Sequence, residues 1–311
     1  MKTKDLVNVP FTERDIPAEE AEPFFRVSKE PLQLEGLCFD RKGDLYFVEV
    51  FNGTVFKLTM KTNKLTKIAQ LRGENPSALK IHKDGRLFLC CLGNFKDSGS
   101  IVAIDPKTKK KETIIPKSKG YVIDDMVFAS DGSFYFSDFK GDSTNPIGGI
   151  YYVDKDYKTI TPVITRLAIP NGLALTPDER GLWVTEMARN QLIFANLNKD
   201  RKSIPPYGTS IPYRFQGMNG PDSCSIDRDG NLYVAMYEQG RVLVFNDKGI
   251  VQKQVILPHS QEGHMLRSTH PMVAPDKKTL IICANDGQGD EGSWLYKAKA
   301  LAKGYKSYQF D

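Results

Sequence analysis

Polar side chains recur at one fixed distance before a set of short turns in this sequence. Counting ten residues back from the apolar residue that follows each turn gives Glu35, Ser77, Asp124, Asp222 and His270. A fourth turn carries one extra residue, and its equivalent position is Asn171. Carboxylates, an amide, a hydroxyl and an imidazole therefore share one register position. Brought together, such groups could bind a cation or move protons.

Carboxylates that meet in a partly dry site repel one another, which costs free energy unless something compensates. A cation is the simplest compensation. Because the candidate ligands are oxygen atoms, a hard ion such as Ca²⁺ or Mg²⁺ suits them, and Zn²⁺ would be tolerated. The alternative is that some of these acids only accept hydrogen bonds from backbone amides at strand starts.

The turns from which these ring positions were counted belong to hairpins. Each joins two apolar or alternating runs through a short polar turn, often Asp-Gly, as in Asp84-Gly85 and Asp131-Gly132. The six hairpins cover residues 39–47, 81–89, 128–136, 175–184, 220–235 and 274–282. A third apolar run follows most hairpins and a short fourth run lies between repeats. Four strands recurring every forty to fifty residues, without helical periodicity, predict propeller blades.

The predicted fold is therefore all-β, a six-bladed β-propeller with four-stranded blades. The first strand of each blade would line a central channel, so the equivalent polar residues would form a ring at its entrance. The residues two positions further are core-like and are expected on the same face, at the next depth. They are Leu37, Leu79, Met126, Leu173, Cys224 and Met272.

Both ends of the chain are expected to close this ring. A strand near Phe24 would complete the last blade beside the C-terminal run 306–310, which removes an exposed sheet edge. Residues 1–22 are expected to be irregular, and residues 23–311 to form a single propeller domain.

Composition narrows the range of binding partners and cellular locations that we expect for this chain. The net charge of +5 is dispersed along the chain, so we expect no nucleic-acid partner, and no apolar run is long enough to span a membrane. The five cysteines show no C-x-x-C spacing and lie in apolar contexts, as buried free thiols of a reducing compartment do. No apolar segment follows the N-terminal lysines, so a cytoplasmic location is expected.

Three segments resemble the metal-site motifs of the gluconolactonase, regucalcin and senescence-marker family of six-bladed propellers. They are Leu34-Glu35-Gly36-Leu37, Pro170-Asn171-Gly172-Leu173 and Gly220-Pro221-Asp222-Ser223. The resemblance extends from about residue 30 to the C-terminus and includes the run 262–271, which is similar to calcium-dependent lactonases of this family. It implies a Ca²⁺-dependent lactone hydrolase acting on a small-molecule lactone. Other divalent ions could substitute for Ca²⁺.

Site residues follow from the resemblance. Glu35, Asn171 and Asp222 fall on the family's metal ligands, Asp124 and Ser223 fall on further contacts, and Asp222 also falls on the proton donor. A second, structural calcium is implied around Asp97, Gly99 and Tyr121. There, however, Pro116 stands where an acid is expected and Lys119 adds a positive charge, so retention of this site stays open.

The expected mechanism uses the ion as a Lewis acid on the lactone carbonyl, with Asp222 moving a proton from water to the leaving alkoxide. Asp124 or Asp125 is the alternative proton shuttle. Candidate substrate-binding residues are Asp125, His264 and His270, although a lone loop histidine is more often structural. The competing hypothesis is a non-enzymatic calcium-binding propeller that acts as an interaction module, because fold alone does not define function.

Overall fold

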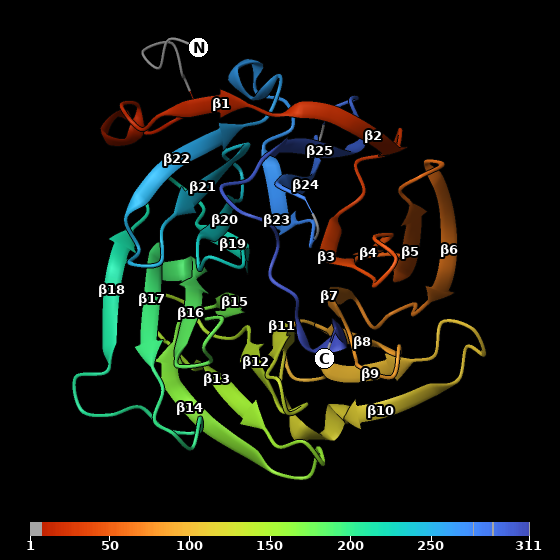
Figure 1. Cartoon of the computed structure of the whole chain (residues 1–311), viewed down its shortest axis with the longest axis vertical. Coiled ribbons are helices and arrows are strands. Elements are labelled where there is room, and N and C mark those ends of the chain that lie inside the picture. Colours follow the sequence, from red (N-terminus) through yellow and green to blue (C-terminus); the bar gives the residue numbers. More distant parts are fainter. Residues whose placement is uncertain (1–7, 276, 288, 311) are drawn as a thin grey trace.

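Alternation of apolar and polar residues, punctuated by Asp-Gly turns, produces the hairpins that the sequence predicts. The computed structural model describes residues 8–275, 277–287 and 289–310. Six sheets stand around a common axis, and all their strand pairs are antiparallel except one in the fifth sheet (Figure 1). The prediction of a six-bladed β-propeller is confirmed.

Each blade begins with an inner strand beside the axis and proceeds outward by hairpins. Blades 1 and 2 consist of β3 (Leu34–Phe39), β4 (Leu45–Glu49), β5 (Thr54–Thr59), β6 (Lys64–Gln70), and β7 (Pro76–Ile81), β8 (Leu87–Cys91), β9 (Ser100–Ile104), β10 (Lys111–Ile115). Blades 3 and 4 consist of β11 (Ile123–Phe128), β12 (Phe134–Asp138), β13 (Gly148–Val153), β14 (Ile160–Leu167), and β15 (Pro170–Leu175), β16 (Gly181–Glu186), β17 (Gln191–Asn196), β18 (Thr209–Arg214).

The last two blades include strands from the N-terminal segment. Blade 5 consists of β19 (Pro221–Ile226), β20 (Leu232–Met236), β21 (Arg241–Phe245), β22 (Val251–Ile256) and β1 (Ala18–Glu20). Blade 6 consists of β23 (Arg267–Val273), β24 (Thr279–Asn285), β25 (Ser293–Lys299) and β2 (Glu22–Ser28). Among the described residues the helical segments are short 3₁₀ turns: η2 (Phe11–Glu13), η3 (Lys117–Lys119), η4 (Met187–Arg189), η5 (Ser260–Glu262) and η6 (Tyr308–Phe310).

The core lies between the blades, where the faces of neighbouring sheets meet. Between blades 2 and 3, Phe88 of β8 packs edge-on against Phe128 of β11, with ring centroids 5.1 Å apart. Comparable clusters of buried apolar residues fill the other interfaces, so each inner strand is held by two neighbours. The five cysteines are buried free thiols, as expected. No helix among the described residues is long and apolar enough to cross a membrane.

An N-terminal strand closes the ring, as predicted. Strand β2 pairs antiparallel with β25, with Glu22 opposite Lys297 and Arg26 opposite Trp294. The expectation of a strand at 306–310 is wrong. Because β2 and β24 already occupy both edges of β25, the C-terminal segment finds no free edge there.

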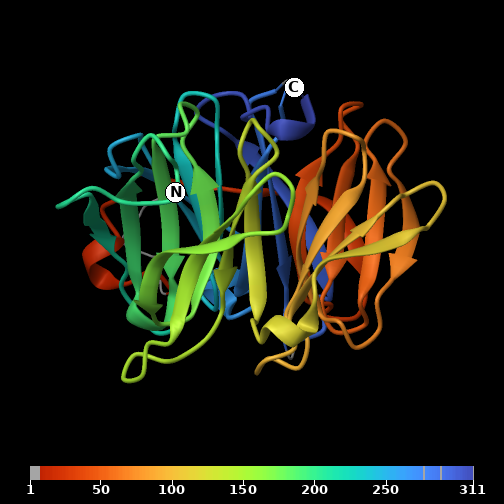
Figure 2. The same cartoon turned by 90° about the horizontal axis from the view of Figure 1, so that it is seen from below.

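The C-terminal segment instead crosses the end of the channel that carries the hairpin turns. Its last turn is η6, and the side chain of Gln309 donates a 2.8 Å hydrogen bond to the carbonyl of Phe39, where β3 ends. Arg41 donates to the carbonyl of Gln309. The C-terminus accordingly lies near the centre of the ring in Figure 1 and at one end of its axis in Figure 2.

The expectation that residues 1–22 are irregular is wrong for Ala18–Glu20. This short strand, β1, pairs in parallel with β22 and gives blade 5 a fifth strand. Glu13 anchors the segment: its carboxylate pairs with the buried Arg241 and accepts a 2.6 Å hydrogen bond from the hydroxyl of Tyr213. Residues 1–7 of this segment lie outside the described residues.

Candidate metal centre

Each inner strand has an irregular register near its first residues. The shifts fall between Glu35 and Cys38, Pro76 and Ala78, Ile123 and Met126, Pro170 and Leu173, Pro221 and Cys224, and Ser268 and His270. Such a bulge re-aims side chains and releases backbone groups from the ladder. The polar residues predicted from the repeat lie within these irregular segments, so simple alternation does not describe where they point.

The ring position of the sixth blade needs a correction. Val273 pairs with Leu280 across residues 274–279, whereas Phe39 pairs with Leu45 across residues 40–44. The sixth turn is therefore longer by one residue than the first, and counting back from Leu280 leads to Thr269 rather than His270. The position two residues further is then Pro271 and not Met272. Asp276 of this turn lies outside the described residues.

His270 consequently occupies the position after the ring, equivalent to Ser223 in blade 5 and Asp125 in blade 3. It is fully buried, and its Nδ1 lies 3.4 Å from Oε2 of Glu35 without forming a hydrogen bond. Neither ring nitrogen has a hydrogen-bond partner among the described residues. Burial, and then the charge of Lys80, hold its pKa well below the usual value, so the imidazole is neutral.

The structure brings four of the predicted ligands together from three blades. Nδ2 of Asn171 donates a 2.7 Å hydrogen bond to Oδ1 of Asp222. The hydroxyl of Ser223 lies 3.4 Å from Oδ1 of Asn171 and 3.5 Å from Oε2 of Glu35. All four residues are buried. Residues from β3, β15 and β19 therefore meet at one place although they are far apart in sequence.

Asp124 is the third acid of the ring, contributed by β11. It is buried like the others, and the hydroxyl of Ser77 donates a 2.8 Å hydrogen bond to its backbone carbonyl. Its carboxylate interacts electrostatically with those of Glu35 and Asp222. Asp124 therefore belongs to the same electrostatic cluster.

Burial and mutual repulsion favour the protonated forms of the three carboxyl groups in this cluster. Burial, followed by the charges of Asp222 and Asp124, raises the pKa of Glu35 well above its usual value. Burial and the charge of Asp222 likewise raise the pKa of Asp124. Burial raises the pKa of Asp222 to about 7, while the hydrogen bond from Asn171 opposes the shift. The charge of Lys80 opposes the shift only for Asp124, and a cation would relieve the remaining repulsion.

Asp125 faces a different environment. Its Oδ1 lies 3.1 Å from Nζ of Lys80 and accepts a 2.7 Å hydrogen bond from the amide of Met126. Its Oδ2 accepts a 3.0 Å hydrogen bond from the amide of Leu173 in blade 4. These contacts join Asp125 to the two neighbouring blades. They favour a structural role for Asp125 over substrate binding. The sequence offered no signal for Lys80, whose position in the channel comes from the blade geometry.

His264 lies away from the ring, on the rim of blade 6. Its Nδ1 is 3.1 Å from both carboxylate oxygens of Asp286, and that hydrogen bond and charge raise the pKa of His264. Asp290 approaches the same pair, and one candidate ligand atom from each of the three residues lies within 4.8 Å of the others. A hollow of about 370 Å³ adjoins His264 and Asp286. Repeat counting did not find this cluster, because it lies in loops.

The residues of the implied second calcium site are only partly gathered. The amide of Gly99 donates a 2.7 Å hydrogen bond to the carbonyl of Tyr121, so these two residues are adjacent. Asp97 is exposed, and its carboxylate accepts a 2.9 Å hydrogen bond from Asn94 within its own loop. Lys117 pairs with Glu74 nearby. The site stays a prediction.

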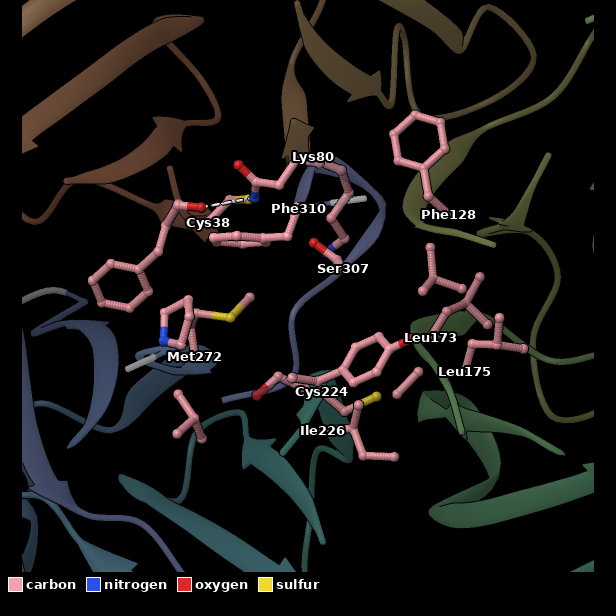
Figure 3. Close-up of a pocket in the computed structure, with 18 residues that line it drawn as sticks. Cys38, Lys80, Phe128, Leu173, Leu175, Cys224, Ile226, Met272, Ser307 and Phe310 are labelled. Atoms are coloured by element: carbon pink, nitrogen blue, oxygen red, sulfur yellow. Dashed lines mark hydrogen bonds between the residues drawn. The ribbon is translucent and has the colours of Figure 1, made fainter. Parts of the chain in front are cut away.

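A small hollow lies further along the channel, between the ring and the C-terminal segment (Figure 3). It measures about 80 Å³, and its lining includes Cys38, Lys80, Leu173, Cys224, Met272 and Phe310. The lining is mostly apolar and contains none of the ring acids. This hollow is therefore separate from the cluster of acids.

Comparison with known proteins agrees with this architecture. Residues 34–284 match the family model described as SMP-30/Gluconolactonase/LRE-like region, and the chain belongs to this family. It is 53% identical over 303 residues to the lactonase drp35 of Staphylococcus saprophyticus subsp. saprophyticus, covering 97% of this chain and 94% of that protein. It is 52% identical over 300 residues to the lactonase drp35 of Staphylococcus aureus strain MRSA252, covering 96% and 93%.

Solved structures show the same fold at low sequence identity. The calcium-binding protein regucalcin from Agrobacterium tumefaciens superposes with a TM-score of 0.77 at 17% identity, covering 95% of this chain and 99% of that chain. A gluconolactonase from Xanthomonas campestris superposes with a TM-score of 0.69 at 16% identity, covering 90% and 96%. The family resemblance predicted from the motifs is confirmed by the family model and by the two staphylococcal relatives.

Proposed function

We propose that this chain is a metal-dependent lactonase that hydrolyses the ester bond of a small-molecule lactone to a hydroxy acid. The observation that carries the proposal is the convergence of Glu35, Asn171 and Asp222 from three blades at one end of the channel. The names of the two staphylococcal relatives, both lactonases more than half identical to this chain, support the same activity.

The chemistry of these residues fits Ca²⁺. Carboxylate, amide and hydroxyl oxygens are the ligands of hard cations, and a bound positive charge would relieve the repulsion among the three acids. Glu35, Asn171 and Asp222 would hold the ion, with Asp124 and Ser223 as further contacts. When bound, the ion would polarise the lactone carbonyl and lower the pKa of a water molecule.

Asp222 would move the proton that ring opening requires. Asn171 fixes the orientation of its carboxyl group, so that this group is placed to accept a proton from water and pass it on. Water adds to the carbonyl carbon, the bond from that carbon to the ring oxygen breaks, and the proton passes to the leaving alkoxide. Asp124 is the alternative shuttle.

Substrate would enter at the ring of acids. The C-terminal segment occupies the other end of the channel, where Gln309 and Phe310 lie. The five buried free thiols support a cytoplasmic location. Neither a nucleic acid nor a membrane is part of the proposal.

Calorimetry and a substrate panel test the proposal. The chelated protein is titrated with Ca²⁺, Mg²⁺ and Zn²⁺, and the hydrolysis of aliphatic and aromatic lactones is followed with each ion. We expect Ca²⁺ binding, hydrolysis that requires the ion, and loss of hydrolysis with chelator. A protein that binds Ca²⁺ but opens no lactone would instead be the calcium-binding interaction module. A protein that binds no divalent ion would contradict the metal assignment.

A further inference from the structure

We propose that Ser137 and Thr185 are positioning residues that fix the backbone of the candidate ligands Asn171 and Asp222 from the neighbouring blade. This inference rests on the metal site proposed above and deepens it. Neither residue belongs to the ring, and both side chains are fully buried in the wall of the channel. Their effect would therefore pass through the ligands rather than through contact with substrate.

Ser137 joins blade 3 to blade 4. It lies in β12, and its Oγ accepts a 3.0 Å hydrogen bond from the amide of Asp125 in its own blade. The same hydroxyl donates a 2.7 Å hydrogen bond to the backbone carbonyl of Asn171. The hydroxyl thus links the irregular segment of β11 to the ligand-bearing residue of β15.

Thr185 repeats this arrangement one blade further. It lies in β16, and its Oγ1 accepts a 2.7 Å hydrogen bond from the amide of Gly172, the residue after Asn171. It donates a 2.7 Å hydrogen bond to the backbone carbonyl of Asp222. Together the two hydroxyls form one series of contacts from Asp125 through Asn171 to Asp222.

These hydroxyls compensate for the irregular register of the inner strands. The bulges release amide and carbonyl groups from the ladder, and an unpaired backbone group in a buried wall is costly. A hydroxyl accepts from one group and donates to another, so a single Ser or Thr satisfies both blades. The relative positions of Asn171 and Asp222 are thereby coupled across the blade interface.

The pattern around the ring points to a role in ligand positioning. The equivalent second-strand positions of blades 1 to 6 are Val48, Cys90, Ser137, Thr185, Ala235 and Cys283. Side chains without a donor, Val48 and Ala235, precede the blades whose ring residues are Ser77 and Thr269. Side chains with a hydroxyl or thiol precede the four blades that carry Asp124, Asn171, Asp222 and Glu35.

Cys283 extends the pattern to the first blade. Its Sγ lies 3.5 Å from the carbonyl of Leu34, directly before Glu35, and the hydroxyl of Thr269 donates a 2.6 Å hydrogen bond to that same carbonyl. A donor from the preceding blade therefore also fixes the backbone beside Glu35. For blade 3 the ring residue Ser77 supplies the donor, with a 2.8 Å hydrogen bond to the carbonyl of Asp124, so each candidate ligand has a donor from the preceding blade at or beside its backbone carbonyl.

Removing the hydroxyls tests the inference. Thr185→Val and Ser137→Ala delete the hydrogen bonds at small change in volume, and Thr185→Ser keeps the hydroxyl. The matched control is Ser268→Ala, which removes an equally buried hydroxyl that bonds to the carbonyls of Met236 and Arg241, neither of which is a candidate ligand. For each full-length variant, Ca²⁺ affinity is measured by calorimetry and thermal unfolding is measured in chelator.

We expect Thr185→Val and Ser137→Ala each to weaken Ca²⁺ binding by about 10- to 100-fold, the usual effect of removing a group that supports a metal ligand. Ser268→Ala should lower the unfolding temperature comparably but leave Ca²⁺ affinity near that of the unmodified protein, and Thr185→Ser should retain affinity. Normal Ca²⁺ binding in both hydroxyl-deletion variants, or equal weakening in Ser268→Ala, would overturn the inference alone. Failure of the unmodified protein to bind Ca²⁺ would overturn the proposed metal site and this inference with it.

Discussion

The side-chain amide of Asn171 donates a 2.7 Å hydrogen bond to the carboxylate of Asp222, 51 residues further along the chain. Each is the second residue of the inner strand of its blade, and the contact exists only because the two blades pack side by side. It orients Asp222 and leaves Oδ1 of Asn171 facing the hydroxyl of Ser223. This pair is the centre of the proposed site.

Asp222→Asn should remove the proton shuttle while retaining the shape of the site. We expect kcat for lactone hydrolysis to fall by about 10²- to 10⁴-fold at saturating Ca²⁺, because an amide cannot carry the proton. Steady-state kinetics with a chromogenic lactone measures this fall. The control Asp229→Asn makes the same chemical change in the exposed turn of the same blade and should leave kcat unchanged. Unchanged kcat in Asp222→Asn would remove this residue from the mechanism.

Glu35→Gln should have opposite effects on the stability of the chelated protein and on the stabilisation that Ca²⁺ provides. Loss of one of three repelling acids should raise the unfolding temperature of the chelated protein, by about 2–4 °C per kcal/mol of relieved repulsion. The stabilisation that added Ca²⁺ provides should shrink, because a ligand is lost. Differential scanning calorimetry with and without Ca²⁺ measures both effects. Glu30→Gln, at an exposed position, is the control, and an unaltered response to Ca²⁺ in Glu35→Gln would contradict the ligand assignment.

The chelated protein should become less stable as the pH rises. The pKa of Asp222 is about 7 in the folded chain, and an unfolded Asp has a pKa of about 4, so between these values the folded state binds more protons than the unfolded state. The free energy of unfolding therefore falls through this window, by an amount on the order of a few kcal/mol.

Denaturant unfolding at a series of pH values, with chelator present, measures this dependence. The raised pKa values of Glu35 and Asp124 act in the same direction. Asp222→Asn should show a shallower decline than the unmodified protein, and Ca²⁺ should restore stability at the high end of the range. A decline of equal slope in the variant would show that Asp222 is not the titrating group.

The C-terminal segment should stabilise the ring without contributing to the metal site. The ring of Tyr308 packs against His82 and Phe128, with centroid distances of 5.0 Å and 5.4 Å, and thereby joins the C-terminus to blades 2 and 3. Tyr308→Ala should lower the free energy of unfolding by about 2 kcal/mol. Chemical denaturation measures this loss, and Tyr207→Ala, at a fully exposed tyrosine, is the control. A weakened Ca²⁺ affinity in Tyr308→Ala would contradict the separation of the two channel ends.

Local patterns predicted the blades well because a hairpin is specified by residues close in sequence. Apolar alternation and Asp-Gly turns defined all six inner hairpins, and register counting placed Glu35, Asp124, Asn171 and Asp222 at equivalent positions. The same counting placed His270 in the ring and missed Thr269, since the sixth turn has one residue more. The signal was local: Pro275 stands five residues before Leu280, as Pro177 does before Leu182 in the other long turn. The expectations for the two ends of the chain were wrong at 306–310 and at Ala18–Glu20. Edge pairing depends on which strands lie beside each sheet edge in the folded chain, and no local pattern specifies that.

The sequence by itself determined the number of blades, the family and the acids that could bind a cation, because these follow from repeated short-range patterns. Only the tertiary structure decided which oxygens meet, that Lys80 forms its ion pair with Asp125, and that Ser137 and Thr185 bridge consecutive blades. Those contacts join residues on different blades, and their geometry depends on bulges and on sheet packing, which no local pattern encodes.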